Sequence, residues 1–181
     1  MNAASDYRKI RFQNPSIGNL NFQRVIEEVL NYMTDKPEKF YEIVVGCDSS
    51  SDERPDFPVA LVVLRKGQGG RFFLTKIRYG QSQKKKFYNW HQRILEEVLL
   101  SCELALVFKE AIEKKLETYL SRPQQGKKLN YQFQYIHADI GVGGPTKDMI
   151  KEVVGLIRSN GFEAKIKPEA FAASVVADRF A

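Results

Sequence analysis

The spacing of apolar residues changes several times along the chain, and each change marks an expected element. Residues 22–33 repeat apolar side chains at helical intervals, and Asn21 in front of them can cap a helix. Three apolar runs follow, at 41–48, 57–66 and 71–79. The sequence Lys-Gly-Gln-Gly-Gly between the last two is typical of a hairpin. We therefore expect one helix followed by three strands that pair antiparallel.

The apolar period lengthens again in the second half. Residues 84–120 repeat apolar side chains every three or four positions, which predicts one long helix or two helices joined by a kink. Residues 131–139 and 162–167 predict two more strands, with a helix at 144–158 between them and a last helix from about 169 to the end. The order β-β-β-α-β-α-β-α, behind an extra N-terminal helix, indicates an α/β fold with a mixed sheet and helices on both faces.

Length and composition are those of one globular domain. The chain has 181 residues, of which 43% are hydrophobic and 28% charged, enough for a full core. We assign 1–20 to an irregular lead-in and 21–181 to the domain. Cys47 and Cys102 both lie in apolar runs, which favours buried thiols in a reducing compartment. With no signal-peptide pattern and no membrane-length apolar run, we expect a cytoplasmic protein without a membrane partner.

Two of the expected central strands end on an aspartate, Asp48 after IVVGC and Asp139 after IHA. Ligands bind at the carboxyl ends of the strands in open α/β sheets. Neighbouring carboxylates repel each other unless a cation lies between them, and such clusters favour Mg²⁺ or Mn²⁺. Gly46 shares the face of Asp48, and we expect it to leave open space beside the carboxylate. The alternative is that each aspartate simply begins a turn.

Two helical carboxylates could join them. Glu103 is flanked at helical spacing by four apolar residues (Leu99, Leu100, Leu106 and Val107), so its charge needs a partner. That partner is an ion at the strand ends, or else a salt bridge or solvent; Glu96 and Glu110 are the substitutes on the same helix. Asp178 lies among small and apolar residues of the last helix. His137 shares the face of Asp139 and belongs to the core or to the site.

The motifs that carry these carboxylates resemble ribonuclease H-like proteins, and in particular the YkuK-type family of predicted ribonuclease H-related proteins. The resemblance runs from about Asn19 to Ala181. It rests on NFQRVIEEVLNYMTDKP, IVVGCDSS, LLSCELAL, YIHADIG, GPTKDMIKEVVG and GFEAKIKPEAFAASVVADRF.

This resemblance implies a ribonuclease H-like fold whose five strands are ordered 3-2-1-4-5, with strands one and four parallel neighbours. It implies a nuclease that hydrolyses phosphodiester bonds of RNA or DNA with two Mg²⁺ or Mn²⁺ ions, held by Asp48, Glu103, Asp139 and Asp178. The histidine-bearing loop of ribonuclease H is missing, and Glu169 is the ionisable residue nearest that place. A nucleic-acid- or metal-binding module without catalysis is the alternative.

Three other stretches suggest contacts with phosphate. The segment 82–93 mixes basic and aromatic residues, which suits a nucleic-acid backbone with stacked bases; the residues are Lys84, Lys85, Lys86, Trp90 and Arg93. A solvated helix start is the alternative there, and the net charge of +6 permits either. Lys165 and Lys167 share one face of the last strand and either meet phosphates or stay solvated. The loop DIGVGGPTK lacks the Walker pattern but is similar to loops of actin-like and sugar-kinase domains, a further alternative.

Overall fold

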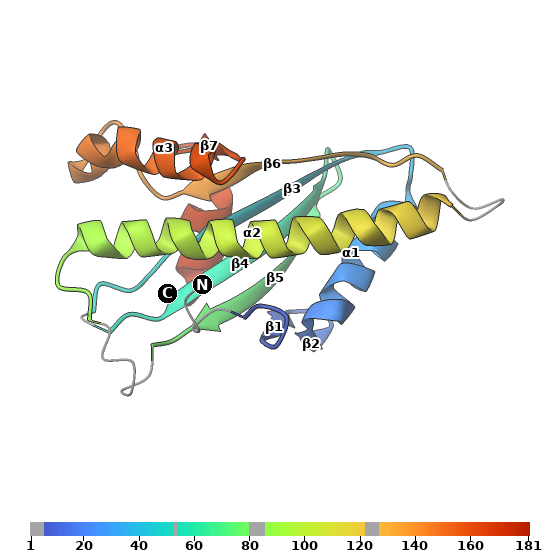
Figure 1. Ribbon diagram of the computed structural model, residues 1–181, viewed down its shortest axis with the longest axis horizontal. Coiled ribbons are helices and arrows are strands. Elements are labelled where there is room, and N and C mark those ends of the chain that lie inside the picture. Colours follow the sequence, from blue (N-terminus) through green and yellow to red (C-terminus); the bar gives the residue numbers. More distant parts are fainter. Residues whose placement is uncertain (1–5, 53, 80–85, 122–126) are drawn as a thin grey trace.

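The computed structural model describes residues 6–52, 54–79, 86–121 and 127–181. Within these ranges the chain forms one mixed sheet covered by helices (Figure 1). The strands are β1 (Arg11–Asn14), β2 (Gly18–Asn21), β3 (Phe40–Cys47), β4 (Phe57–Arg65), β5 (Gly70–Ile77), β6 (Asn130–Ala138) and β7 (Glu163–Lys165). The helices are α1 (Phe22–Asp35), α2 (Trp90–Leu120) and α3 (Ile150–Ser159), with the short helical turns η2 (Pro145–Met149), η3 (Ala172–Ala177) and η4 (Asp178–Phe180).

The strand order is β2-β1-β5-β4-β3-β6-β7. The five predicted strands correspond to β5-β4-β3-β6-β7, so their predicted order is confirmed. β3 pairs antiparallel with β4 and parallel with β6, and the parallel pair is the one that the resemblance implied. The predicted number of five is wrong, because β1 and β2 extend the sheet beyond β5 to seven strands.

The two extra strands form a hairpin inside the segment that we predicted to be irregular. Phe12 and Asn14 of β1 are buried, in alternation with exposed neighbours. The Asn14 side chain accepts hydrogen bonds from the backbone N–H groups of Ser16 and Ile17, and Gly18 has a φ of 90°. β1 joins the sheet where Gln13 pairs with Leu74 of β5. Strands of four mostly polar residues produce too short a pattern to be recognised from sequence.

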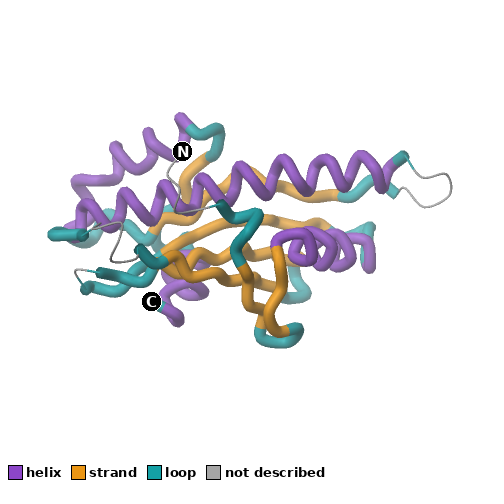
Figure 2. The backbone as a smooth tube through the Cα atoms, turned by 60° about the horizontal axis from the view of Figure 1, so that its bottom comes forward, coloured by secondary structure: helices purple, strands orange, loops and turns teal. Residues whose placement is uncertain are grey.

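Three helices cover one face of the sheet. Around the main core α2 packs on β3, β4 and β6, while α1 contacts α2 and the strands β1 and β2, and α3 contacts α2 and β7 (Figure 2). As predicted, α1 is capped by Asn21, whose side chain accepts from the backbone N–H of Arg24. The predicted helix at 84–120 is the single 31-residue α2, about 46 Å long. It begins at Trp90 because the Asn89 side chain caps it, accepting from the backbone N–H of Gln92. No described helix is long and apolar enough to cross a membrane.

The C-terminal segment covers the opposite face with a smaller cluster of small and apolar residues from β3, β4, β5, η3 and η4. We predicted one helix here; η3 has the wide turns of a π-helix and η4 is a 3₁₀ turn. A Cβ at Gly46 of β3 would lie 2.5 Å from the backbone nitrogen of Ala173. The open space predicted beside Asp48 is therefore wrong, since the backbone of η3 fills it. Gly46 permits this close approach.

Candidate metal and nucleic-acid site

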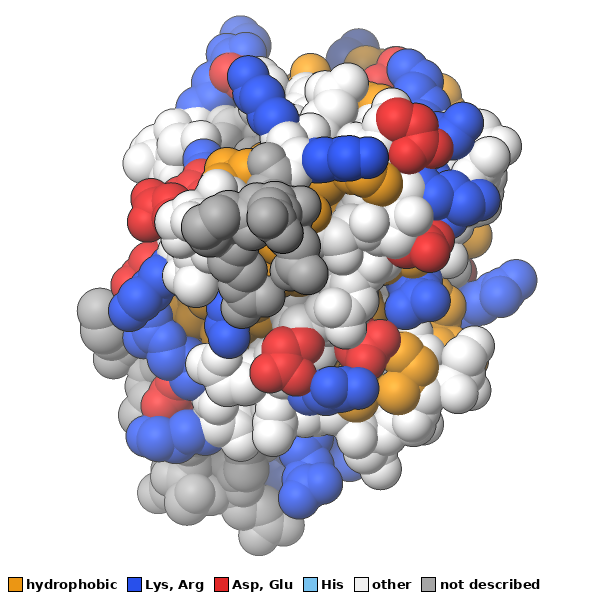
Figure 3. Space-filling view, turned by 90° about the vertical axis from the view of Figure 1, so that its right-hand side faces the viewer, with side chains coloured by type: hydrophobic (Ala, Val, Ile, Leu, Met, Phe, Trp, Pro, Cys, Tyr) orange, Lys and Arg blue, Asp and Glu red, His pale blue; other side chains and the backbone are white. Residues whose placement is uncertain are grey.

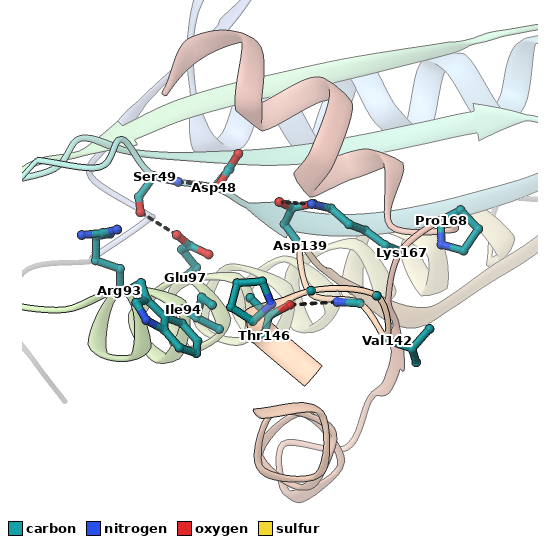
Figure 4. A pocket seen from close by; sticks show the side chains of 15 residues that line it. Asp48, Ser49, Arg93, Ile94, Glu97, Asp139, Val142, Thr146, Lys167 and Pro168 are labelled. Carbon is teal, nitrogen blue, oxygen red and sulfur yellow. Dashed lines mark hydrogen bonds and ion pairs between the residues drawn. The ribbon is translucent and has the colours of Figure 1, made fainter. Parts of the chain in front are cut away.

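The two strand-end aspartates lie next to each other. The parallel register between β3 and β6 pairs Cys47 with Ala138, so Asp48 and Asp139 leave adjacent strands at the same level. The Asp48 carboxylate accepts a hydrogen bond of 2.8 Å from the backbone N–H of Ser49. Both aspartates line a pocket of about 680 Å³ at the carboxyl edge of the sheet (Figure 4). This is the edge at which open α/β sheets bind ligands.

Three further segments complete this pocket. The first two turns of α2 form one wall, with Trp90, Arg93, Ile94 and Glu97. The loop from Gly141 to Thr146 forms another wall, closed by a hydrogen bond from the backbone N–H of Gly141 to Thr146 Oγ1 (3.1 Å). Lys167 and Pro168, after β7, form the third segment, and the Lys167 side chain reaches Asp139 (Figure 4).

The helical carboxylate in the pocket is Glu97, which we did not predict. Glu97 is only 7% exposed, and its Oε1 accepts a hydrogen bond of 2.5 Å from Ser49 Oγ. Glu103 was chosen because the residues three and four positions away on both sides are apolar. Glu97 does not meet this criterion, because Arg93 and Ser101 lie four positions before and after it. Position along the helix is the criterion that selects Glu97. Since α2 starts near the carboxyl edge of the sheet, residues in its first two turns reach that edge.

The structure does not bring Glu103 to the pocket. Six residues beyond Glu97, it lies about 9 Å further along α2 and about 120° around it. Glu103 is half-buried, and its charge contributes to raising the pKa of Tyr7 and Cys102. The two substitutes are occupied elsewhere as well. Glu96 accepts a hydrogen bond from the Tyr79 hydroxyl, and Glu110 forms an exposed ion pair with Arg8.

Asp178 lies next to Asp48 but outside the pocket lining. It is exposed at the start of η4, and its charge and side-chain hydrogen bond both contribute to raising the pKa of Asp48. Asp139 has a different partner: Lys167 Nζ lies 2.9 Å from its Oδ2. The other oxygen, Asp139 Oδ1, is buried and has no hydrogen-bond partner among the described residues. The structure thus places Asp178 beside Asp48, with Asp139 on the neighbouring strand and Glu97 on the α2 side of the pocket.

Burial and mutual repulsion perturb the carboxyl groups. Burial raises the pKa of Asp48 from 3.8 to about 6, and the charges of Asp139 and Asp178 act in the same direction, while the hydrogen bond from Ser49 opposes them. Burial likewise raises the pKa of Glu97 from 4.5 to about 8, with the charges of Asp48 and Asp139 adding to it. Carboxyl groups whose pKa is raised by burial and by neighbouring carboxylates in one pocket are typical of functional sites.

His137 and Glu169 do not line the pocket. The His137 ring is buried against Phe171, and its Nδ1 accepts a hydrogen bond from the backbone N–H of Ala172 (3.1 Å). Burial lowers the pKa of His137 to about 3, so the ring is neutral. It therefore joins the contact between β6 and η3. Glu169 is exposed.

The structure describes three of the five residues that we predicted to contact nucleic acid. Trp90 and Arg93 line the pocket, and Lys86 is exposed just before α2; Lys84 and Lys85 lie outside the described residues. Lys165, for which the sequence left open a phosphate contact or a solvated strand face, forms a partly buried ion pair with Glu42 (2.7 Å). At the other end of the molecule, where α2 finishes, Lys and Arg side chains alternate with Asp and Glu rather than forming one basic patch (Figure 3).

The side-chain positions do not form a closed coordination shell. Within 6–52, 54–79, 86–121 and 127–181, no three His, Cys, Asp or Glu side chains are grouped closely enough to hold a metal ion. Ser49 Oγ donates a hydrogen bond to Oε1 of Glu97, and Lys167 Nζ forms an ion pair with Oδ2 of Asp139. The two bonds direct these carboxylates toward protein partners.

Comparisons with known proteins agree with the fold. The family model described as "Ribonuclease H-like" matches residues 24–181. The chain is 31% identical over 170 residues to the "Uncharacterized protein YkuK" of Bacillus subtilis (strain 168), covering 93% of this chain and 95% of that protein. No solved structure gives a significant match. The family match and the relative both span nearly the whole chain, and the protein therefore belongs to the ribonuclease H-like family.

Proposed function

We propose that this protein is a metal-dependent nuclease that hydrolyses phosphodiester bonds of RNA or DNA. The observation that carries the proposal is the grouping of Asp48 and Asp139 at the ends of two parallel strands, in a pocket shared with Glu97. Family membership supports the same conclusion. We assign the role of the helical carboxylate to Glu97 in place of Glu103, and that of the C-terminal carboxylate to Asp178.

The residues present fit divalent cations. Carboxylate-only clusters select hard ions such as Mg²⁺ or Mn²⁺, and we propose two ions held by Asp48, Glu97, Asp139 and Asp178. The buried, unpartnered Oδ1 of Asp139 is an acceptor that lacks a donor or a cation. Burial, and to a smaller extent the neighbouring carboxylates, raise the pKa of Asp48 and Glu97, and a bound cation would favour their charged forms. A cation would take the place that Ser49 Oγ and Lys167 Nζ occupy beside two of these carboxylates.

Bound ions in such sites lower the pKa of an attacking water and stabilise the leaving oxygen. The protein's own groups do the rest. The backbone N–H of Ser49 orients the Asp48 carboxylate, and Lys167 and Arg93 supply positive charge on two sides of the pocket for a phosphate group. None of the four carboxylates needs to carry a proton.

A nuclease assay with three variants tests the proposal. Single-stranded, duplex, hybrid and junction substrates are incubated with the protein and Mn²⁺, and products are separated on denaturing gels. Asp48→Asn should abolish cleavage. Glu97→Gln should lose at least about a hundredfold, since even groups that only support metal ligands are worth 10–100-fold.

Glu103→Gln is the matched comparison, the same change on the same helix outside the pocket. It should keep cleavage within a fewfold of the wild type. Circular dichroism and thermal melts confirm that each variant is folded. Wild-type protein that cuts none of the substrates would contradict the proposed activity. Loss of cleavage in Glu103→Gln but not in Glu97→Gln would instead restore the assignment made from the sequence.

A further inference from the structure

Trp90 is the residue at the pocket whose exposure is hardest to explain by folding. It is 40% exposed at the first position of α2, and its ring contacts that of its own neighbour His91. Val142 on the opposite loop is 69% exposed, and Pro145 and Pro168 are exposed as well. Four exposed apolar side chains thus line the same pocket as a buried Glu97 and the half-buried Asp48 and Asp139. Such a rim suits a flat, apolar group above a charged floor.

The wall of α2 presents three chemistries in sequence. Trp90, Arg93 and Glu97 are spaced by three and four residues, so they form one stripe that leads from the rim to the floor over about 10 Å. An aromatic surface comes first, then a guanidinium, then the carboxylate beside Asp48. A nucleotide within a strand has matching parts in the same order: a base, then a phosphate group, and in that group the P–O bond to be cut.

The pocket also limits what can enter. Its volume of about 680 Å³ is bounded on one side by α2 and on the other by the loop from Gly141 to Thr146. That is the size of a small-molecule pocket, typically about 300–1,000 Å³. A pocket of this size takes a group as large as one unpaired nucleotide, whereas a base pair adds a second base and a second backbone.

From these observations we infer that the substrate is single-stranded nucleic acid, bound with an unpaired base stacked on Trp90. The inference rests on the proposed function, since it names the substrate class of the same site. It decides among substrates that the sequence leaves open, because duplex and hybrid substrates keep their bases paired. Stacking on an aromatic ring also accepts any base, so we expect little sequence preference.

Fluorescence tests this inference without cleavage. Trp90 is the only tryptophan in the chain, so intrinsic emission reports this wall alone. The Asp48→Asn protein is titrated in EDTA with a short oligonucleotide, either single-stranded or annealed to its complement as a blunt duplex. We expect the single strand to quench Trp90 and the duplex to leave it unchanged at the same concentrations.

Binding by anisotropy of a labelled strand gives the magnitude. Trp90→Ala should weaken single-strand binding by about 5- to 100-fold, as expected for the loss of one base–aromatic stack; Trp90→Phe should recover most of it. Leu99→Ala is the control, because Leu99 is 41% exposed on the same helix and does not line the pocket; it should bind as the parent does.

Three results would overturn the inference: equal quenching by the duplex, wild-type affinity in Trp90→Ala, or saturation by a mononucleotide at the same concentration as by the strand. Its failure is distinguishable from that of the proposed function. If the wild type binds single strands through Trp90 but cuts none, the stacking site stands and the proposed nuclease activity is wrong. If the wild type cuts nucleic acid but single strands do not quench Trp90, the nuclease activity stands and the stacking site is wrong.

Discussion

Gly46 offers a quantitative test of how the C-terminal segment is held on the sheet. In Gly46→Ala the new Cβ would lie 2.5 Å from the backbone nitrogen of Ala173 and 2.8 Å from the carbonyl carbon of Ala172. Uncharged heavy atoms normally approach to about 3.5 Å, so η3 would have to retreat by about 1 Å. Overpacking of this kind costs about 1–3 kcal/mol. Because the obstacle is backbone, which cannot rotate away, we expect about 2–3 kcal/mol.

For a chain of this length each kcal/mol lowers the melting temperature by about 2–4 °C, so the expected decrease is about 4–12 °C. The variant should stay folded at 25 °C, since domains are typically stable by about 5–15 kcal/mol. Urea unfolding followed by circular dichroism measures the free energy directly. The retreat should also move Asp178, which follows η3, away from Asp48, and so weaken Mn²⁺ binding.

Gly155→Ala is the matched control. Gly155 lies within α3, and an added Cβ there would meet nothing within 4 Å. Alanine should therefore stabilise the protein by about 0.5–1 kcal/mol through helix propensity. The reasoning about close approach is refuted if Gly46→Ala unfolds at the same urea concentration as the wild type, or at a higher one like the control.

Lys167→Met should bind Mn²⁺ about three- to tenfold more tightly by calorimetry, because the half-exposed ammonium competes with the ion for Asp139; equal affinities would mean that they do not compete. Asp48→Asn should raise the melting temperature of the metal-free protein at pH 8 but not at pH 4. The pKa of Asp48 is raised from 3.8 to about 6 on folding, so its ionisation destabilises the fold increasingly between these values and fully above them; equal shifts at both pH values would contradict this. Arg65→Leu should lower the free energy of unfolding by about 1–3 kcal/mol in urea, since the buried guanidinium donates to the carbonyl oxygen of Tyr32. Asp35→Asn, which alters only its exposed partner, should cost less than about 1 kcal/mol.

The central sheet could be predicted because its signals are local and repeated. From Ile43 to Cys47 β3 is buried on both faces, as expected of a strand in the middle of a sheet, and both β3 and β6 are followed by an aspartate. Once the two strands are taken as parallel neighbours, Asp48 and Asp139 must meet. The cap at Asn21 could be predicted for the same reason, since its side chain accepts a hydrogen bond from the backbone N–H only three residues away.

The helical carboxylate could not be chosen by burial alone. Glu97 is more deeply buried than Glu103, yet its sequence neighbours are more polar, because one of them lines the pocket with it. What decides the choice is distance from the sheet edge along α2, which depends on where that helix begins. Its start at Trp90 is set by the cap at Asn89, six residues later than the apolar period suggested.

The close contact at Gly46 was missed for a similar reason. A glycine in a strand signals either an open space or an approaching backbone, and the sequence does not distinguish the two. The answer comes from η3, more than a hundred residues later, whose alanines are small enough to bring its backbone onto the sheet.

The β1–β2 hairpin decides what a shortened form of the protein would do. Without it β5, an eight-residue strand, would present unpaired backbone groups at the rim of the sheet, where another molecule could add a strand. With it the rim is β2, four residues that are mostly glycine and asparagine and poorly suited to such pairing. The family match begins at residue 24, beyond the hairpin. A fragment trimmed to that boundary would keep every carboxylate of the site and lose the protection against intermolecular strand pairing, and should aggregate.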